Sequence, residues 1–482
     1  MLRVRVARTT ITPPEGMSML GYAGREGVAQ GKDGELYATA LVLEDERTRV
    51  GILRCDRAFV QEPLASVLRR QIGVRLGVPP RHVLLNASHT HCGPTLQDFH
   101  YDDDPAQQRM REAYSAWLCK EIPEVGGRAV DRLCRARLGT ATGEARIGVN
   151  RREPQPDGSV ILGGNPMGPV DKEVRVIRID DLEGRPVAVV FAHGCRPVTM
   201  GPKCLRWSAD YVGSARDLVE GILGCLSLFL QANGGDINPV TGIGSGEDDW
   251  DAKNRIGLTL GGEVLKVHSS IYTNSVRAPR TFFGTLAKAS IYARVKLERE
   301  PEYVLAVRES TLGLPIQELP GFETAREILE RGEAEVTRLT AEKSSEAALN
   351  VARRWRHWAR ALFDVVANGG RPLLLGSVQA LSESARFRLL RFRERPFPVS
   401  ASRLSGVRRC ETRFLSALAT GVCATFPHGM RFRRMDGRFK NAITFRICCF
   451  RHTRHRPHWF QRQGKGGGEG AGTDRGACDR YS

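Results

Sequence analysis

Short apolar runs alternate with stretches of helical spacing through the first 140 residues, and this alternation restricts the fold more than any other feature. The expected elements are, in order, strands at 36–43 and 50–55, a helix at 64–76, a strand at 82–85 and a helical stretch at about 105–138. Gly77 and Pro79 should end the first helix, whereas Pro123 and the Gly126-Gly127 pair should interrupt the second. This order predicts an α/β protein with a mixed β-sheet core flanked by helices.

The same pattern continues to about residue 381. The expected strands are 174–179, 186–192, 226–231 and 373–381, and helical stretches should begin at Ser208-Ala209-Asp210 and span about 322–368. In the last stretch Trp355, Trp358, Leu362 and Val365 form an apolar stripe. We interpret this stripe as packing and not as a ligand site, because apolar residues at helical spacing usually face a core.

The net charge of +18 invites a nucleic-acid or anionic-membrane interpretation, but the excess is confined to the end of the chain. Residues 381–482 carry 22 Lys and Arg against 7 Asp and Glu, which leaves 50 basic and 47 acidic residues in the first 380. The body of the protein is therefore nearly neutral. We expect no specific nucleic-acid partner for it, since such binding needs a concentrated basic surface.

The chain suggests a cytoplasmic protein. Its first residues, Met1-Leu-Arg-Val-Arg-Val, contain no apolar segment of signal-peptide length and lead directly into a predicted strand, and no run of about 18 apolar residues appears. The 12 cysteines include no CxxC pair, so reduced thiols are expected.

Two histidines, His89 and His91, follow the strand at 82–85 and precede a Gly-Pro break. Such a pair can supply two metal ligands, or one ligand and one acid/base partner, and it can equally consist of ordinary polar loop residues. Cys92 beside them is interpreted as a small packing residue in preference to a ligand.

Other polar residues stand at predicted strand ends or helix starts. His193 ends the strand at 186–192, and Asp56 ends the one at 50–55. Asp210 can cap a helix or orient a ligand. The segment 232–239, Ala-Asn-Gly-Gly-Asp-Ile-Asn-Pro, could hold its backbone close to a bound group, although a plain tight turn is the simpler interpretation.

Taken together, these segments resemble the N-terminal catalytic domain of the neutral/alkaline non-lysosomal ceramidase family. The matching pieces are Ile11-Thr-Pro-Pro-Glu-Gly with Gly21-Tyr-Ala, Ala87-Ser-His-Thr-His-Cys-Gly-Pro, Val149-Asn-Arg, Ala192-His-Gly, Ser208-Ala-Asp and Gln231-Ala-Asn-Gly-Gly-Asp-Ile-Asn-Pro. The resemblance covers about residues 1–381. It implies a zinc amidase acting on an N-acyl bond, with a small-molecule or lipid amide as substrate and peripheral membrane contact as a further expectation.

The resemblance also implies roles for individual residues. His89 and His193 would bind Zn²⁺, His91 would be the neighbouring acid/base or orienting imidazole, and Arg151 would face the substrate or its developing oxyanion. The remaining expectations place Gly21, Asn150 and Asp210 at the substrate, and Asp236 and Asn238 in the catalytic turn. Zn²⁺ lowers the pKa of bound water to about 7, and one oxyanion donor contributes about 3–4 kcal/mol in comparable sites.

The sequence departs from the family at Asn238, where ceramidases carry the serine proposed as nucleophile. An amide side chain cannot replace that serine. The resemblance therefore indicates a related branch, in which a metal-activated water attacks the carbonyl directly or the substrate is not ceramide.

The second departure concerns the last fifth of the chain. The family takes a Glu and a Tyr ligand from this region, and neither can be assigned here. We hypothesise that residues 382–482 are an out-of-frame translation following a domain at 1–381, because excess Arg and lost periodicity fit a shifted frame. The alternative is a disordered basic extension that binds RNA or anionic lipid, with Phe387, Phe392 and Phe432 between arginines.

Two questions stay open at the level of sequence. Asp56, Asp210 and Asp236 could each supply an oxygen ligand in place of the missing Glu and Tyr. A catalytically inactive family member that acts as a binding scaffold is the competing interpretation, and the oligomeric state is not indicated.

Overall fold

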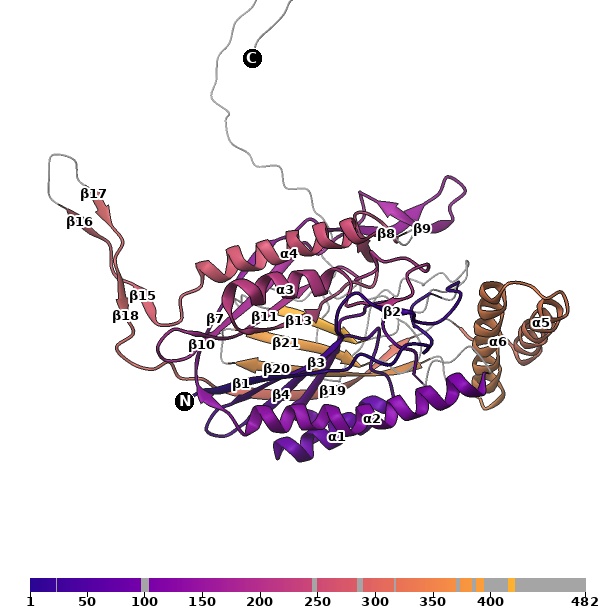
Figure 1. The fold of residues 1–482 in the computed structure, drawn as a ribbon, viewed down its shortest axis with the longest axis horizontal. Coiled ribbons are helices and arrows are strands. Elements are labelled where there is room, and N and C mark those ends of the chain that lie inside the picture. The colour runs from indigo at the N-terminus through magenta and orange to yellow at the C-terminus, as the bar shows by residue number, and fades with distance from the viewer. Residues whose placement is uncertain are drawn as a thin grey trace, which may run out of the picture.

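The computed structural model describes residues 1–22, 24–96, 104–244, 249–283, 289–315, 318–369, 373–383, 387–393 and 415–420. These residues form a mixed α/β fold, as the sequence predicted. Two sheets pack face to face, and each carries a pair of helices on its outer side (Figure 1).

The first sheet has the strand order β5-β4-β3-β1-β6. Its strands are β1 (Arg3–Thr10), β3 (Tyr37–Glu44), β4 (Arg49–Cys55), β5 (Val83–Ala87) and β6 (Cys134–Arg135). Only β4 and β5 run parallel, because α1 (Leu64–Leu76) makes the crossover between them. Together with α2 (Pro105–Val130), α1 covers the outer face of this sheet.

The second sheet has the order β13-β11-β10-β7 and repeats that plan. It contains β7 (Arg137–Glu144), β10 (Glu173–Asp180), β11 (Pro186–His193) and β13 (Leu226–Gln231). The hairpin β10–β11 is followed by α3 (Tyr211–Leu223), which returns the chain to β13 in parallel with β11. α3 and α4 (Trp250–Ser270) cover its outer face.

The central core lies between the two sheets. Alternate residues of β3 and β4, such as Leu41 and Ile52, meet Ile177 and Val190 from the second sheet. The opposite faces of the same strands pack on the helices, so both sides of each sheet are buried. This is why the strands appear in the sequence as nearly continuous apolar runs.

A third sheet lies along the β5 and β13 edges of the other two. β19 (Leu305–Pro315), β20 (Leu373–Glu383), β21 (Phe387–Arg393) and β22 (Leu415–Thr420) are hydrogen-bonded in that order. α5 (Phe322–Ala341) and α6 (Glu346–Ala367) form a hairpin between β19 and β20 that projects from the body (Figure 1).

The smaller elements complete the described chain. A three-stranded sheet joins β14 (Ile237–Pro239), β8 (Gly148–Pro154) and β9 (Val160–Asn165), and β2 (Gly31–Lys32) pairs with β12 (Arg206–Trp207). Two strand pairs form the long projection at the other side of Figure 1. They are β15 (Ser275–Arg277) with β18 (Arg294–Lys296), and β16 (Thr281–Phe283) with β17 (Ala289–Ile291).

The predicted interruption of the helix at 105–138 is wrong. α2 continues through Pro123 and both glycines, ends at Val130, and is followed directly by β6 and β7. Gly126 lies so close to α1 that an added Cβ would be 2.6 Å from Leu76 Cδ1. Tight packing between α1 and α2 therefore outweighs the weak helix propensity of these residues.

The Trp stripe of α6 packs less deeply than expected. Trp355 and Trp358 contact each other with ring centroids 4.7 Å apart and remain partly exposed, while Ala352 and Ala359 are the buried residues of this helix. The stripe faces α5, since Gly332 of α5 lies against Trp355.

The proposed boundary at residue 381 stays a prediction. β20 ends two residues beyond it, and β21 and β22 continue the same sheet. The rest of the predicted tail, residues 384–386, 394–414 and 421–482, lies outside the described residues, and Phe432 is among them. None of the helices described is both long enough and apolar enough to cross a membrane.

Candidate active site

The candidate residues gather where β5, β11 and β13 end. Asn86 of β5 joins the two sheets at this point, because its Nδ2 donates to Gln231 O at 3.3 Å and its Oδ1 accepts from Gln231 N at 3.0 Å. The neighbouring Ala232 N donates to His193 O at 3.0 Å. The carboxyl ends of parallel strands thus bring the His89 and His193 segments to one edge of the sandwich, which is the usual place for a site in such folds.

His89 is held in an uncommon conformation with its ring orientation fixed. Its φ is +70°, in the left-handed region that few non-glycine residues adopt. Its N–H donates to Arg57 O at 2.9 Å, and its Nδ1 lies 2.9 Å from Ala58 O. A carbonyl oxygen only accepts, so Nδ1 carries the proton and Nε2 presents a lone pair.

His193 is oriented by the same device. Its Nδ1 lies 3.0 Å from Glu173 O, so its Nε2 also presents a lone pair. Metal-binding histidines characteristically donate their other ring N–H to a backbone carbonyl or carboxylate. The two histidines that resemble zinc ligands in the sequence therefore share the hydrogen-bond pattern expected of ligands.

His91 lies directly against His89. The two Nε2 atoms are 3.4 Å apart, and Tyr22 packs edge-on against the His91 ring at 4.9 Å between centroids. Gly21 lies against the base of the His91 side chain, where an added Cβ would be 2.5 Å from His91 Cβ. Gly21, expected at the substrate, is thus seen to position His91.

All three imidazoles are neutral at pH 7. Burial is the main cause that lowers the pKa of His89 to about 3, with the Arg196 charge second and that of Arg151 also contributing. Burial also lowers the pKa of His91 well below its usual value, aided by His89 and Arg196, and it lowers that of His193. Neutral imidazole is the form that binds a metal.

The His89–His91 geometry fits a shared metal ion. Two nitrogens bound at about 2.0–2.1 Å with tetrahedral angles lie about 3.3 Å apart, close to the observed Nε2–Nε2 spacing. The complete ligand set is not found in the described part of the chain, which contains no group of three or more His, Cys, Asp or Glu side chains arranged for a metal. The fit to a metal ion therefore extends only to the His89–His91 pair.

Two of the candidate aspartates are engaged in structural contacts. Asp56 forms ion pairs with Arg54 and Arg216 and accepts from Tyr37 N at 3.1 Å. Asp210 is the N-cap of α3, where its carboxylate accepts from Tyr211 N at 2.6 Å, Met200 N at 3.0 Å and the Thr199 hydroxyl. This supports the capping interpretation of Asp210.

The catalytic turn expected at 236–238 pairs with the Asn150–Arg151 strand. Ile237 is opposite Asn150 in the β14–β8 register, and Asn150 Nδ2 lies 3.3 Å from Asp236 Oδ2. Arg151 N donates to Asp236 O at 2.7 Å. Asn238 is buried, and its Oδ1 accepts no hydrogen bond from a described residue.

Arg196, which sequence reasoning missed, stands between His193 and this turn. The residue is 3% exposed, and its charge lowers the pKa of both His89 and His91. The sequence did offer a signal for Arg196, since it follows the strand-end His193 by only three residues. Cys92 is buried with its Sγ 3.9 Å from Arg25 Nη2, which supports the packing interpretation.

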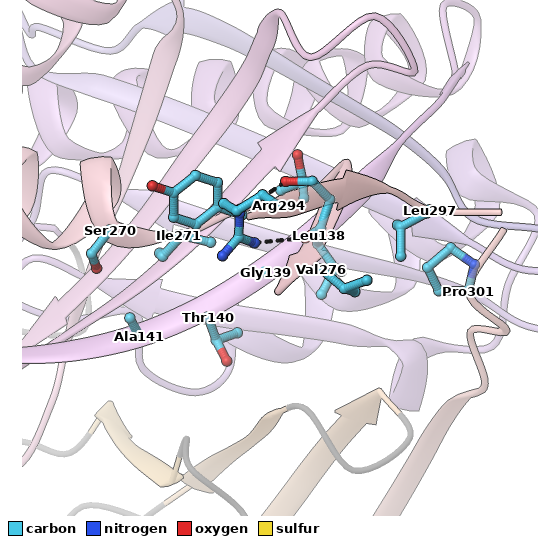
Figure 2. Close-up of a pocket in the computed structure, with 13 residues that line it drawn as sticks. Leu138, Gly139, Thr140, Ala141, Ser270, Ile271, Val276, Arg294, Leu297 and Pro301 are labelled. Carbon is cyan, nitrogen blue, oxygen red and sulfur yellow. Dashed lines mark hydrogen bonds between the residues drawn. The ribbon is translucent and has the colours of Figure 1, made fainter. Parts of the chain in front are cut away.

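The cavities described elsewhere in the molecule do not coincide with this site. One of about 550 Å³ lies between β7 and the base of the β15–β18 pair, and Arg294 reaches into it (Figure 2). Another of about 710 Å³ lies beside β6 and the start of β13. None of the candidate site residues lines either cavity.

Comparison with solved structures identifies a shared fold. A ceramidase complexed with C2 has 16% sequence identity and a TM-score of 0.56, with 87% of this chain and 68% of that chain covered. The neutral ceramidase from Pseudomonas aeruginosa has 18% identity and a TM-score of 0.56, with 87% and 67% covered. No family model and no curated protein matches the sequence. At these identities the likeness shows the fold.

Proposed function

We propose that this chain is a zinc-dependent hydrolase that cleaves the C–N bond of an N-acyl amide, either a small molecule or a lipid. The observation that carries the proposal is the facing pair of Nε2 atoms on His89 and His91, 3.4 Å apart, at the strand ends that also hold His193. The ceramidase-like fold supports it, since both similar structures are named as ceramidases.

His89 and His193 would hold the ion through Nε2, because their Nδ1 atoms are committed to Ala58 O and Glu173 O. His91 Nε2 is close enough to serve as a third nitrogen or to exchange a proton beside it. Zn²⁺ supplies Lewis-acid polarisation of the amide carbonyl and activates water at neutral pH.

The side chains around the imidazoles suit the charge that develops during amide hydrolysis. Arg151 and Arg196 are both tied to the 234–237 turn beside His193, by Arg151 N to Asp236 O at 2.7 Å and by Arg196 Nε to Gly234 O at 3.0 Å, and their charges lower the pKa of His89. A tetrahedral oxyanion would be stabilised by such a guanidinium. Asn238 has no hydroxyl that could form an acyl intermediate, so the proposal takes water as the nucleophile.

The first test measures metal and activity on the same purified protein. We expect close to one Zn²⁺ per chain by elemental analysis, and release of the amine from N-acyl substrates. His89→Ala should lower the metal content and reduce hydrolysis by at least about a hundredfold. His357→Ala is the matched control, because His357 is exposed on α6, far along the chain from the cluster.

A catalytically inactive scaffold is the competing function. It is favoured by the incomplete ligand set among the described residues. Folded protein that binds no Zn²⁺ at micromolar concentration, with His89→Ala and wild type equally inactive, would establish the scaffold and reject the hydrolase.

A further inference from the structure

Arg196 is anchored so that only part of its guanidinium is used by the protein. Its backbone N donates to Ile237 O at 3.2 Å, and its Nε donates to Gly234 O at 3.0 Å. Both contacts fix the residue to the 234–237 turn. Neither terminal nitrogen of the guanidinium forms a hydrogen bond with a described residue. A buried nitrogen without a partner would be an orphaned polar atom, and neither of these two is one, so both reach accessible space.

Among the described residues, Arg196 lacks the countercharge that several of the buried arginines have, as do Arg25 and Arg57. Arg54 and Arg216 share Asp56, and Arg175 is paired with Asp171 and Glu173. Within the part of the chain that the structure describes, no carboxylate forms an ion pair with Arg196. A guanidinium cannot lose its proton in a protein, and a buried charge without a partner is costly.

Arg196 lies at the strand end that carries His193. It follows His193 by three residues, and its Nε donates to Gly234 O at 3.0 Å, close to Ala232, whose N donates to His193 O at 3.0 Å. Its charge also lowers the pKa of His89, second only to burial as a cause. Positive charge at this strand end favours an anionic ligand.

We infer that Arg196 selects an amide substrate that carries a carboxylate close to the scissile C–N bond. This inference rests on the proposed hydrolase function and names its substrate class. The planar terminal nitrogens match a carboxylate in a bidentate arrangement. A neutral N-acyl amino alcohol offers no such group and would leave the guanidinium without a partner.

Binding can be tested without catalysis. We would titrate metal-free protein with N-dodecanoylglycine and with its neutral counterpart N-dodecanoylethanolamine, using calorimetry. We expect the carboxylate to bind at least about tenfold more tightly, and the difference to shrink as ionic strength rises. Arg196→Gln should abolish the difference, while Arg196→Lys should keep part of it. Arg152→Gln is the control, since Arg152 is an exposed neighbour on β8.

Hydrolysis then gives a second, separate readout. The zinc-loaded protein is assayed with N-dodecanoylglycine, with N-glutaryl dodecylamine and with N-dodecanoylethanolamine, which place the carboxylate on the amine side, on the acyl side or nowhere. We expect Arg196→Gln to raise KM for the preferred carboxylate substrate about tenfold or more and to leave the neutral one nearly unchanged.

The possible failures are distinguishable. A carboxylate preference in binding without any hydrolysis would support the role of Arg196 and reject the hydrolase. Hydrolysis with equal use of neutral and anionic amides, or an equal loss of kcat on both in Arg196→Gln with an unchanged melting profile, would overturn the inference. An equal loss of kcat on both substrates would mean that Arg196 stabilises the reaction and does not select the substrate.

Discussion

At the residue scale, the sequence identified the groups that carry the chemistry but not how they are held. His89, His91 and His193 could be named because they stand at predicted strand ends. The carbonyl partners Ala58 and Glu173 could not, since backbone acceptors leave no mark in side-chain identity. The role of Gly21 was also hidden, because its contact with His91 joins two loops 70 positions apart in the chain.

Gly21 gives a test at this scale. Gly21→Ala must place a Cβ 2.5 Å from His91 Cβ and adopt a φ of +122°, so we expect a loss of about 2–4 kcal/mol in the free energy of unfolding. Gly16→Ala is the matched control, as its φ is +80° with no atom within 4 Å of the added Cβ. It should cost about 1 kcal/mol. Equal losses in urea unfolding would show that the His91 contact is not tight.

At the scale of elements, apolar periodicity predicted most of the buried strands and helices. β4, β10, β11, β13 and α1 occur within about a residue or two of the expected bounds. The long strands β7 and β19 and the helix α4 were missed, and β7 begins inside the stretch 105–138 that was expected to be helical. The smaller strands β8, β9 and β14–β18 were missed because they are short or exposed and lack a sustained apolar period. The continuity of α2 was missed because the contact that overrides its glycines is tertiary.

The ion-pair cluster of Asp56 tests how these elements are joined. Asp56 ends β4 and pairs with Arg216 on α3, so it links the first sheet to a helix of the second. Asp56→Asn leaves the buried Arg54 without a carboxylate and Arg216 with only the exposed Asp217, and we expect a loss of about 3–5 kcal/mol in unfolding free energy. Asp217→Asn, at the exposed partner of Arg216, should cost less than about 1 kcal/mol. Comparable effects would contradict a structural role specific to Asp56.

The acid sensitivity of the protein should follow from the same cluster. Burial raises the pKa of Asp56, but the Arg54 and Arg216 charges outweigh it and hold the pKa below its usual value. The unfolded chain therefore binds a proton more readily than the folded one, so this contribution to stability is present above about pH 4 and lost as pH falls below it. Asp56→Asn should flatten the fall in melting temperature between about pH 4 and pH 2; an unchanged slope would assign acid unfolding to other groups.

At the scale of the whole molecule, the two similar halves explain why the site lies where it does. Each half makes a hairpin, crosses back through a helix and adds a parallel strand, which brings β5 and β13 side by side at Asn86. The alternation of elements in the sequence predicted each half. It did not predict that the two sheets pack face to face. A strand that is apolar on both faces can pack on a helix or on another sheet, and its sequence pattern is the same in either case.

The third sheet makes the domain boundary testable. A chain ending at Leu381 lacks the last two residues of β20 and all of β21, which pairs with it from Ser377 to Glu383. An uncovered strand edge promotes aggregation, so we expect this variant to melt lower and to aggregate sooner than one ending at Thr420. Peptide mass mapping of the natural protein should accompany the comparison. If both variants melt alike, and no peptide beyond residue 381 matches the sequence, the boundary at 381 and the shifted frame are supported together. If the shorter variant melts lower, and peptides from the tail match the sequence, β21 and β22 belong to the native fold.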